Sequence, residues 1–144
     1  MELRNLTPHP LGLHGPEGIL NLPVAGAAPR LDVSRVALGT LAGLPLVRST
    51  MGKVQGLPAQ EPGVVLVVSA LVAEAAPERT DLAYPGEALR DEAGRVIGAR
   101  GLCAGPGLAK LTAINTRLAA LENATASTVA EGLARLARYG EQQP

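Results

Sequence analysis

The sequence predicts an α+β protein: a small mixed or antiparallel sheet of short strands with one short helix, followed by a helical C-terminal tail. The most apolar stretch of the chain, Val64 to Val68, is bounded by Pro62-Gly63 and reads as a strand buried on both faces. Beyond Gly107 the apolar residues recur at helical spacing. We therefore expect two domains, an α+β module over residues 1–104 and a helical tail over residues 107–140.

Composition narrows the classes of function. The chain of 144 residues has no Phe, no Trp and two Tyr, so aromatic stacking on nucleic-acid bases is not expected. Its formal net charge is zero, which gives no electrostatic basis for non-specific binding to nucleic acid. No apolar run is long enough to span a membrane, and no signal peptide is recognisable. The expectation is a soluble protein in the cytoplasm of a bacterial cell.

Cysteine and histidine are scarce. Cys103 is the only cysteine, so no internal disulfide can form. With only His9 and His14 available, it does not make a zinc site. We expect Cys103 to be a small core residue and expect neither a metal nor a cofactor.

The first half of the chain predicts short strands and turns. Pro8 and Pro10 end a first strand because proline has no N–H for a central ladder. A hairpin follows, with its turn at residues 14–18, and then a surface connection at 23–29. Residues 37–43 are open between a loop and one helical turn. The expected segments are a strand at 2–7, the hairpin strands near 11–13 and 19–22, short strands at 30–36 and 44–48, a turn with a short extended piece at 52–58, and a polar connector at 58–63.

The central strand leads into the predicted short helix. Ser69 stands at the N-cap position, residues 70–76 are mostly helix formers, and Pro77 ends the helix. A polar patch, Glu78 to Asp81, follows at once. Polar residues at the end of a buried strand are a common place for a ligand, and also a common end of an ordinary core strand.

The next segment predicts a second hairpin. Residues 82–84 are expected to be extended, with a turn at Pro85-Gly86. Two further extended runs, 88–90 and 95–103, flank Asp91-Glu92-Ala93-Gly94, and Gly94 is expected in the left-handed region. Residues 104–107 break the strand and separate the module from the tail.

The tail carries a candidate oligomer interface. Leu111, Ile114, Leu118 and Leu121 have heptad a and d spacing, and Arg117 and Glu122 would occupy g and e positions whose charges pair between helices. The segment from Arg117 to Glu122 resembles the motif of short trimeric coiled coils. An amphipathic helix covering its own sheet uses the same spacing and stays an alternative. Residues 123–127 weaken the helix, so we expect a second helix that starts at a capping box, Thr128 to Glu131, and presents Val129, Leu133 and Leu136.

No enzyme motif is present, so a non-enzymatic role is favoured over catalysis. Arg79, Arg90 and Arg100 are candidate anion contacts, because guanidinium binds carboxylate or phosphate through two N–H groups. Solvated surfaces and local ion pairs are their alternative roles. His9, held between two prolines, could position a proton donor or acceptor. The predicted ligand-binding residues are His9, Ser69, Arg79, Asp81, Arg90 and Arg100.

Several segments together resemble a family of small uncharacterised proteins of phages and bacterial genomes that open with Asn-Leu-Thr-Pro-His. The segments that carry the resemblance are Asn5 to His9, Gly56 to Pro58, Val67 to Ala73, Arg79 with Asp81, and Arg90 to Arg100. The resemblance covers residues 2–103 and implies no activity, since none is assigned to the family. The helical tail lies outside it.

Two main hypotheses follow. The leading one is a non-enzymatic phage-type accessory protein that binds a small anionic ligand, such as a nucleotide-like molecule, at strand ends and turns. The alternative is a structural or assembly protein, located in a virion, whose tail joins copies of the chain into a homo-oligomer such as a trimer. A hydrolase or transferase that uses His9 is a distant third.

Overall fold

The structure is a computed structural model that describes residues 1–140, with side chains to residue 138. The chain divides into two units, Met1–Ala109 and Lys110–Pro144. The first unit contains all the strands and one short helix. The second unit contains most of one long helix. The predicted α+β class is confirmed.

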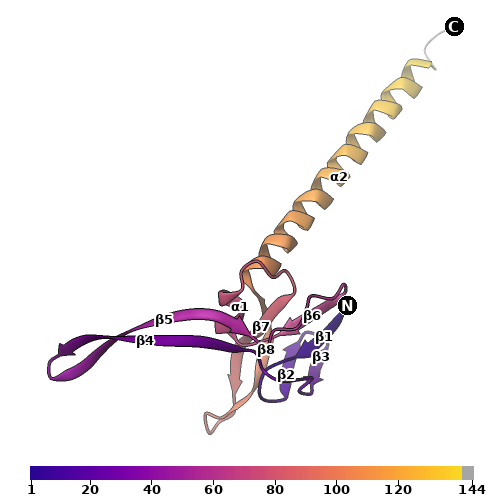
Figure 1. The fold of residues 1–144 in the computed structure, drawn as a ribbon. Helices are drawn as coiled ribbons and strands as arrows, with labels where there is room; N and C mark the ends of the chain where they lie inside the picture. Colours follow the sequence, from indigo (N-terminus) through magenta and orange to yellow (C-terminus); the bar gives the residue numbers. More distant parts are fainter. Residues whose placement is uncertain (141–144) are drawn as a thin grey trace. The chain divides into compact units, whose positions relative to one another are not determined.

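Six short strands form the main sheet of the first unit (Figure 1). Their order is β1-β6-β7-β8-β2-β3, with parallel pairs β1–β6, β6–β7 and β2–β8 and antiparallel pairs β7–β8 and β2–β3. We call this sheet together with helix α1 the body. Its elements are β1 (Glu2–Asn5), β2 (Leu11–Gly15), β3 (Gly18–Leu22), β6 (Val64–Val67), α1 (Ala70–Ala75), β7 (Leu82–Arg90) and β8 (Val96–Ala104).

Strand β6 is buried on both faces, as its run of aliphatic residues predicts. Leu66 and Val68 pack in one cluster with α1, whereas Val67 packs in a second cluster with Leu13 and Leu22. Ser69 caps α1 as expected, and its hydroxyl accepts a hydrogen bond from the Val72 N–H at 3.3 Å. The alternation of a β-strand therefore sends adjacent aliphatic residues into two separate cores.

The two edges of the sheet meet at Asn5, at the end of β1. The Asn5 carbonyl accepts a hydrogen bond from Ala25 N–H, and its side-chain amide donates to the Leu22 carbonyl oxygen at 3.1 Å. Asn5 is only 1% exposed, so these contacts replace bonds to water inside the protein. The sheet is thereby curled around its second cluster.

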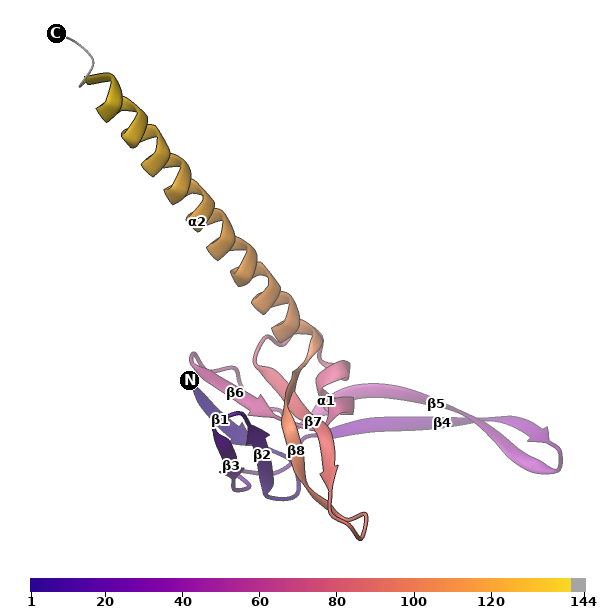
Figure 2. The ribbon, with the colours of Figure 1, turned by 180° about the vertical axis from the view of Figure 1, so that it is seen from behind.

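The largest difference from expectation is a two-stranded sheet that extends away from the body (Figures 1 and 2). It consists of β4 (Arg30–Leu41) and β5 (Leu44–Gln55), each of 12 residues. We call this hairpin the arm. The predicted short strands at 30–36 and 44–48 are the first parts of β4 and β5. Residues 37–43, expected as a loop or helical turn, include the end of β4 and the hairpin turn. The expected turn at 52–58 begins as strand.

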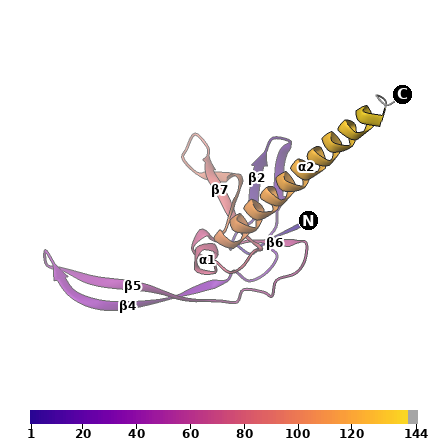
Figure 3. The same cartoon turned by 90° about the horizontal axis from the view of Figure 1, so that it is seen from above.

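Only the base of the arm packs on the body, near α1 (Figure 3). The partly buried Val54 lies against the cluster that contains Val72 and Ala73 of α1. Beyond this base the arm is exposed on both faces.

The second predicted hairpin is confirmed, with one correction. Gly94 has φ of 78°, and the Asp91 carboxylate accepts from the N–H groups of Ala93 and Arg95. The turn expected at Pro85-Gly86 is wrong, because β7 runs through it. A Cβ on Gly86 would collide with the Arg100 carbonyl oxygen, so glycine serves close strand approach there.

The tail is one helix, α2 (Pro106–Gly140), of 35 residues. The predicted second helix with a cap at Thr128 is wrong. The Thr128 hydroxyl instead donates to the Ala124 carbonyl oxygen one turn earlier, and Thr125 does the same to Leu121. Across the residues that the structure describes, no helix has the length and apolarity needed to cross a membrane.

Cys103 also differs from expectation. Its thiol is free, and the residue is exposed on β8 rather than buried in the core. Cys103 pairs with Tyr84 across the ladder between β7 and β8. The proximity of Cys103 is the largest of the causes that raise the pKa of the Tyr84 phenol.

Candidate functional site

Arg79 and Asp81 form an internal ion pair rather than an open anion site. Arg79 Nε and Nη2 donate to the two Asp81 carboxylate oxygens at 2.8 and 2.6 Å, and Nη1 donates to the Pro58 carbonyl oxygen at 2.8 Å. Their side chains are 16% and 5% exposed. The hydrogen bonds that Arg79 donates to the Asp81 carboxylate raise the pKa of Arg79, so the guanidinium stays charged. This pair fastens the start of β7 to the connector before β6.

His9 contributes its backbone rather than its imidazole to the described contacts. Its carbonyl oxygen accepts from the Asn5 amide at 2.9 Å and lies 3.0 Å from the Thr7 hydroxyl. The Asn5 side-chain oxygen in turn accepts from the Thr7 N–H. The Asn-Leu-Thr-Pro-His segment is therefore a structural clamp at the meeting of the sheet edges. The His9 side chain is exposed, and no hydrogen bond joins it to a nucleophile or carboxylate of the described residues.

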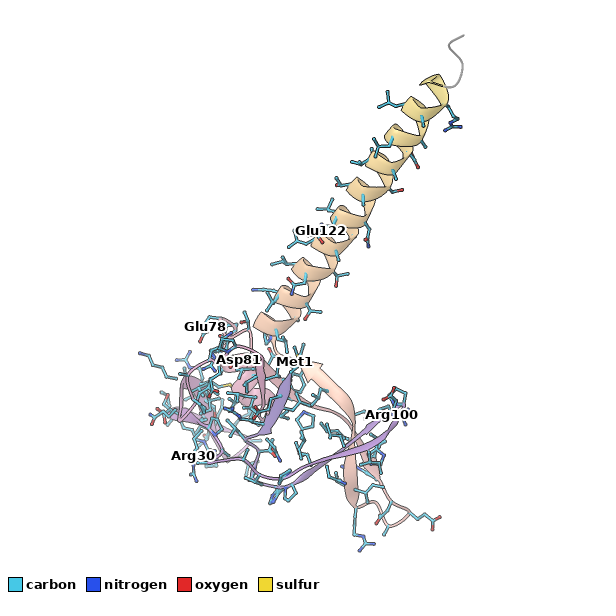
Figure 4. The ribbon with its side chains drawn as sticks, turned by 90° about the vertical axis from the view of Figure 1, so that its right-hand side faces the viewer. Met1, Arg30, Glu78, Asp81, Arg100 and Glu122 are labelled. Atoms are coloured by element: carbon cyan, nitrogen blue, oxygen red, sulfur yellow. The ribbon has the colours of Figure 1, made fainter. Side chains whose placement is uncertain are left out.

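Arg90 and Arg100 lie on the β7–β8 hairpin, away from the Arg79–Asp81 pair. Figure 4 shows Arg100 well separated from Asp81. Arg90 donates to the Gly94 carbonyl oxygen at 2.8 Å, and Arg100 lies 3.8 Å from the Glu87 carboxylate in an exposed pair. Both guanidinium groups stay accessible to solvent.

The six predicted ligand contacts thus do not converge on one place. Ser69 caps a helix, Arg79 and Asp81 bind each other, and the remaining three are spread over separate turns and strands. Binding of a small anion stays a prediction, which calorimetry against nucleotides and phosphorylated metabolites would test. Within the described residues, no group of His, Cys, Asp and Glu is arranged to hold a metal ion.

The long helix carries a continuous set of exposed apolar residues. Between Leu111 and Leu136 its apolar residues follow one another at spacings of three or four, with Thr125 filling the one gap. We call this set the α2 stripe: Leu111, Ile114, Leu118, Leu121, Thr125, Val129, Leu133 and Leu136. Its seven apolar members are between 39% and 70% exposed.

The predicted interface residues all lie on or beside this stripe. Leu118 and Leu121 are 52% and 64% exposed, and the exposed residues Arg117 and Glu122 flank them in the sequence. Figure 4 shows Glu122 on α2. Neither charged residue forms an ion pair within the described part of its own chain. They are therefore available to pair with another helix.

Sequence reasoning missed two features. It separated Val129, Leu133 and Leu136 from the stripe by placing a helix end at residues 123–127, although Thr125 keeps the spacing intact. It also missed the arm, whose signal was present: apolar residues recur on both sides of Ala42-Gly43, the φ values of which are 49° and 80°.

Comparison of the chain with protein-family models, with curated proteins and with solved structures found no match. The resemblance to small phage and bacterial proteins therefore stays a prediction.

Proposed function

We propose that this protein is a structural assembly protein whose copies associate into a homotrimer through helix α2. The observation that carries the proposal is the exposed α2 stripe. A long helix gains most of its stability from burial of such a stripe rather than from helix propensity. Each fully buried Leu contributes about 1.5–3 kcal/mol to the free energy of unfolding. Because the α2 stripe is exposed in the single chain, the helix lacks this stabilisation there.

The body has no need of this stripe. Both of its core clusters consist of residues from the first unit, and no buried side-chain N or O atom of the described residues lacks a hydrogen-bond partner. The occupant that suits the stripe is a second and third copy of the same helix. In that arrangement Leu118 occupies an a position, Leu121 a d position, and Arg117 at g faces Glu122 at e of the neighbouring helix.

The spacing of the residues in the stripe also predicts the supercoil of the associated helices. From Leu121 through Thr125 and Val129 to Leu133 the spacing is four at each step, which departs from the alternation of three and four. Added residues of this kind locally unwind a left-handed supercoil. The proposal is therefore a regular coil over residues 111–121, followed by a straighter packing of the same helices.

The double substitution Leu118→Glu with Leu121→Glu tests the proposal. Like charges brought together at core positions of three helices repel, so the mass measured by light scattering should fall from that of three chains to that of one. The control, Ala113→Glu with Ala120→Glu, adds the same charge to the opposite side of the helix and should keep the mass of three chains. Equal masses for the two variants would refute the proposal.

A further inference from the structure

The arm is the second element of the chain that exposes more apolar surface than its own fold can bury. A two-stranded hairpin alone is marginally stable in water. Its large apolar side chains beyond the base are between 40% and 69% exposed. They are Val33, Val36, Leu38, Leu41, Leu44, Leu46, Val47 and Met51. Contiguous apolar exposure of this kind marks an interaction surface.

The tip of the arm is apolar where hairpin turns are usually polar. Leu41 and Leu44 pair with each other directly beside the Ala42-Gly43 turn and are 66% and 69% exposed. Both turn residues have positive φ, which holds the two strands in the tight twist of a primed hairpin turn. Ala42 is the one non-glycine residue with positive φ among the described residues. The geometry fixes two adjacent leucines at the far end of a projecting element.

The body offers a receptor for such a tip. An open surface cavity of about 510 Å³ lies between the β2–β3 hairpin, β8 and β1. Its lining is predominantly apolar and adjoins the second core cluster, to which Leu13 belongs. Five aliphatic residues line it: Leu3, Leu13, Ile19, Leu20 and Leu102. Apolar side chains that enter this cavity would extend an existing core.

The arm and the rest of residues 1–109 carry net charges of opposite sign. The arm carries four basic side chains and one acidic, a net charge of +3, from Arg30, Arg35, Arg48 and Lys53 against Asp32. The rest of residues 1–109 carries nine acidic and five basic side chains, a net charge of −4. Glu17 stands in the cavity lining itself. The opposite net charges favour the encounter of an arm with a body, whereas the like charges of two arms disfavour their encounter.

We propose that the arm binds the body of a neighbouring copy of this chain, with Leu41 and Leu44 in the cavity beside β3. Arm and cavity are different surfaces, so the contact is heterologous and each copy supplies one of each. Such contacts leave no surface unpaired when they close into a ring. Closure with three copies depends on the proposed function, since α2 would set the number of chains, whereas the contact itself needs only residues 1–109.

Disulfide trapping between two distinguishable chains tests this proposal. Both full-length chains carry Cys103→Ser, because the natural thiol is exposed. One chain carries Leu44→Cys and the other, with a longer tag, carries Leu20→Cys. After co-expression and mild oxidation, non-reducing electrophoresis should show the heterodimer as the main linked species. The control pairs Leu44→Cys with Glu92→Cys in the exposed β7–β8 turn and should give no heterodimer.

Every outcome of the disulfide-trapping experiment either supports or contradicts the arm contact. Absence of the heterodimer overturns the proposal, whether Leu44→Cys chains link to each other, Leu20→Cys chains do so, or nothing links. The same test in chains with Leu118→Glu and Leu121→Glu separates the two interfaces. A heterodimer that persists in that background supports the arm contact, and a mass that the two α2 substitutions leave unchanged would refute the α2 trimer. If chains with an unchanged α2 have the mass of three chains but form no heterodimer, the arm contact is refuted and the α2 trimer is not.

Discussion

The body differs from the arm and from α2 in how far its apolar residues are buried. In the body, Val67, Val68 and Leu82 are each 0% exposed. By contrast, Leu44 of the arm is 69% exposed and Leu136 of α2 is 70% exposed. The body therefore has the organisation of a self-sufficient domain, whereas the arm and α2 leave most of their large apolar side chains exposed.

Polar contacts differ in the same way. The buried side chains of Asn5, Thr7 and Asp81 all have partners within the body. The helix charges Arg117 and Glu122 have no ion-pair partner in the described part of their chain. The comparison predicts that changes in the body alter folding stability, whereas changes in α2 alter association.

Removal of α2 should have the largest effect on association and little effect on folding. The cut belongs after Ala109, the end of the first unit, because Gly105 and Gly107 are buried and Gly107 lies against the Arg79 carbonyl oxygen. We expect residues 1–109 to give a folded product that no longer forms a trimer, measured by circular dichroism and light scattering. An unfolded or aggregated product would contradict the self-sufficiency of the body.

Arg79→Ala should cause the largest loss of stability from a single substitution. It leaves the Asp81 carboxylate buried without its partner, which costs about 3–5 kcal/mol of unfolding free energy. Loss of folding on Arg79→Ala would favour the ion-pair alternative over the anion contact expected for this arginine. The matched control is Arg100→Ala, an exposed arginine whose loss should change stability by less than about 0.5 kcal/mol. Urea unfolding at one chain concentration measures both, and equal values would contradict the structural role of the pair.

Val67→Ala tests the two-faced burial of β6. Loss of two methyl groups from a fully buried site should lower the unfolding free energy by about 1–3 kcal/mol. Val96→Ala, which removes the same groups from a side chain that is 58% exposed, should cost less than about 0.5 kcal/mol. Similar losses for the two variants would show that β6 is not the centre of the core.

The smallest predicted effect separates a buried α2 stripe from an exposed one. Thr125→Leu completes the stripe and should stabilise the trimer by about 1 kcal/mol per chain, because it adds apolar area to the helix interface. Asn123→Leu places the same side chain on the other side of the helix and should give no such gain. The concentration dependence of thermal unfolding measures both, and a gain for Asn123→Leu alone would place the interface elsewhere.

Local sequence signals predicted the body well because its elements are short and residues such as Pro, Gly and Ser mark their ends. Pro62-Gly63, Ser69 and Pro77 bound β6 and α1, and Gly94 marks its hairpin. The failures came where a pattern was read as a stop and tertiary geometry overrode it. Pro85-Gly86 continues β7 because glycine allows close approach of β8, and Thr128 bonds back along α2 instead of capping a new helix.

The candidate site was predicted only in part, for a related reason. The predicted interface residues from Leu111 to Glu122 follow a local repeat, so sequence alone placed them along one side of a helix. The polar residues of the body gave no such guide, because the partner of a buried arginine depends on chain connections that only the fold provides. Arg79 binds the carbonyl of Pro58, which lies 21 positions earlier in the chain.

The mass of the wild-type protein in solution tests the central claim most directly. Multi-angle light scattering over a range of concentrations should give the mass of three chains of 14.7 kDa each, with dissociation only on dilution. A mass of one chain at the highest concentration would mean that the α2 stripe has no partner in other copies, and would contradict the assembly function.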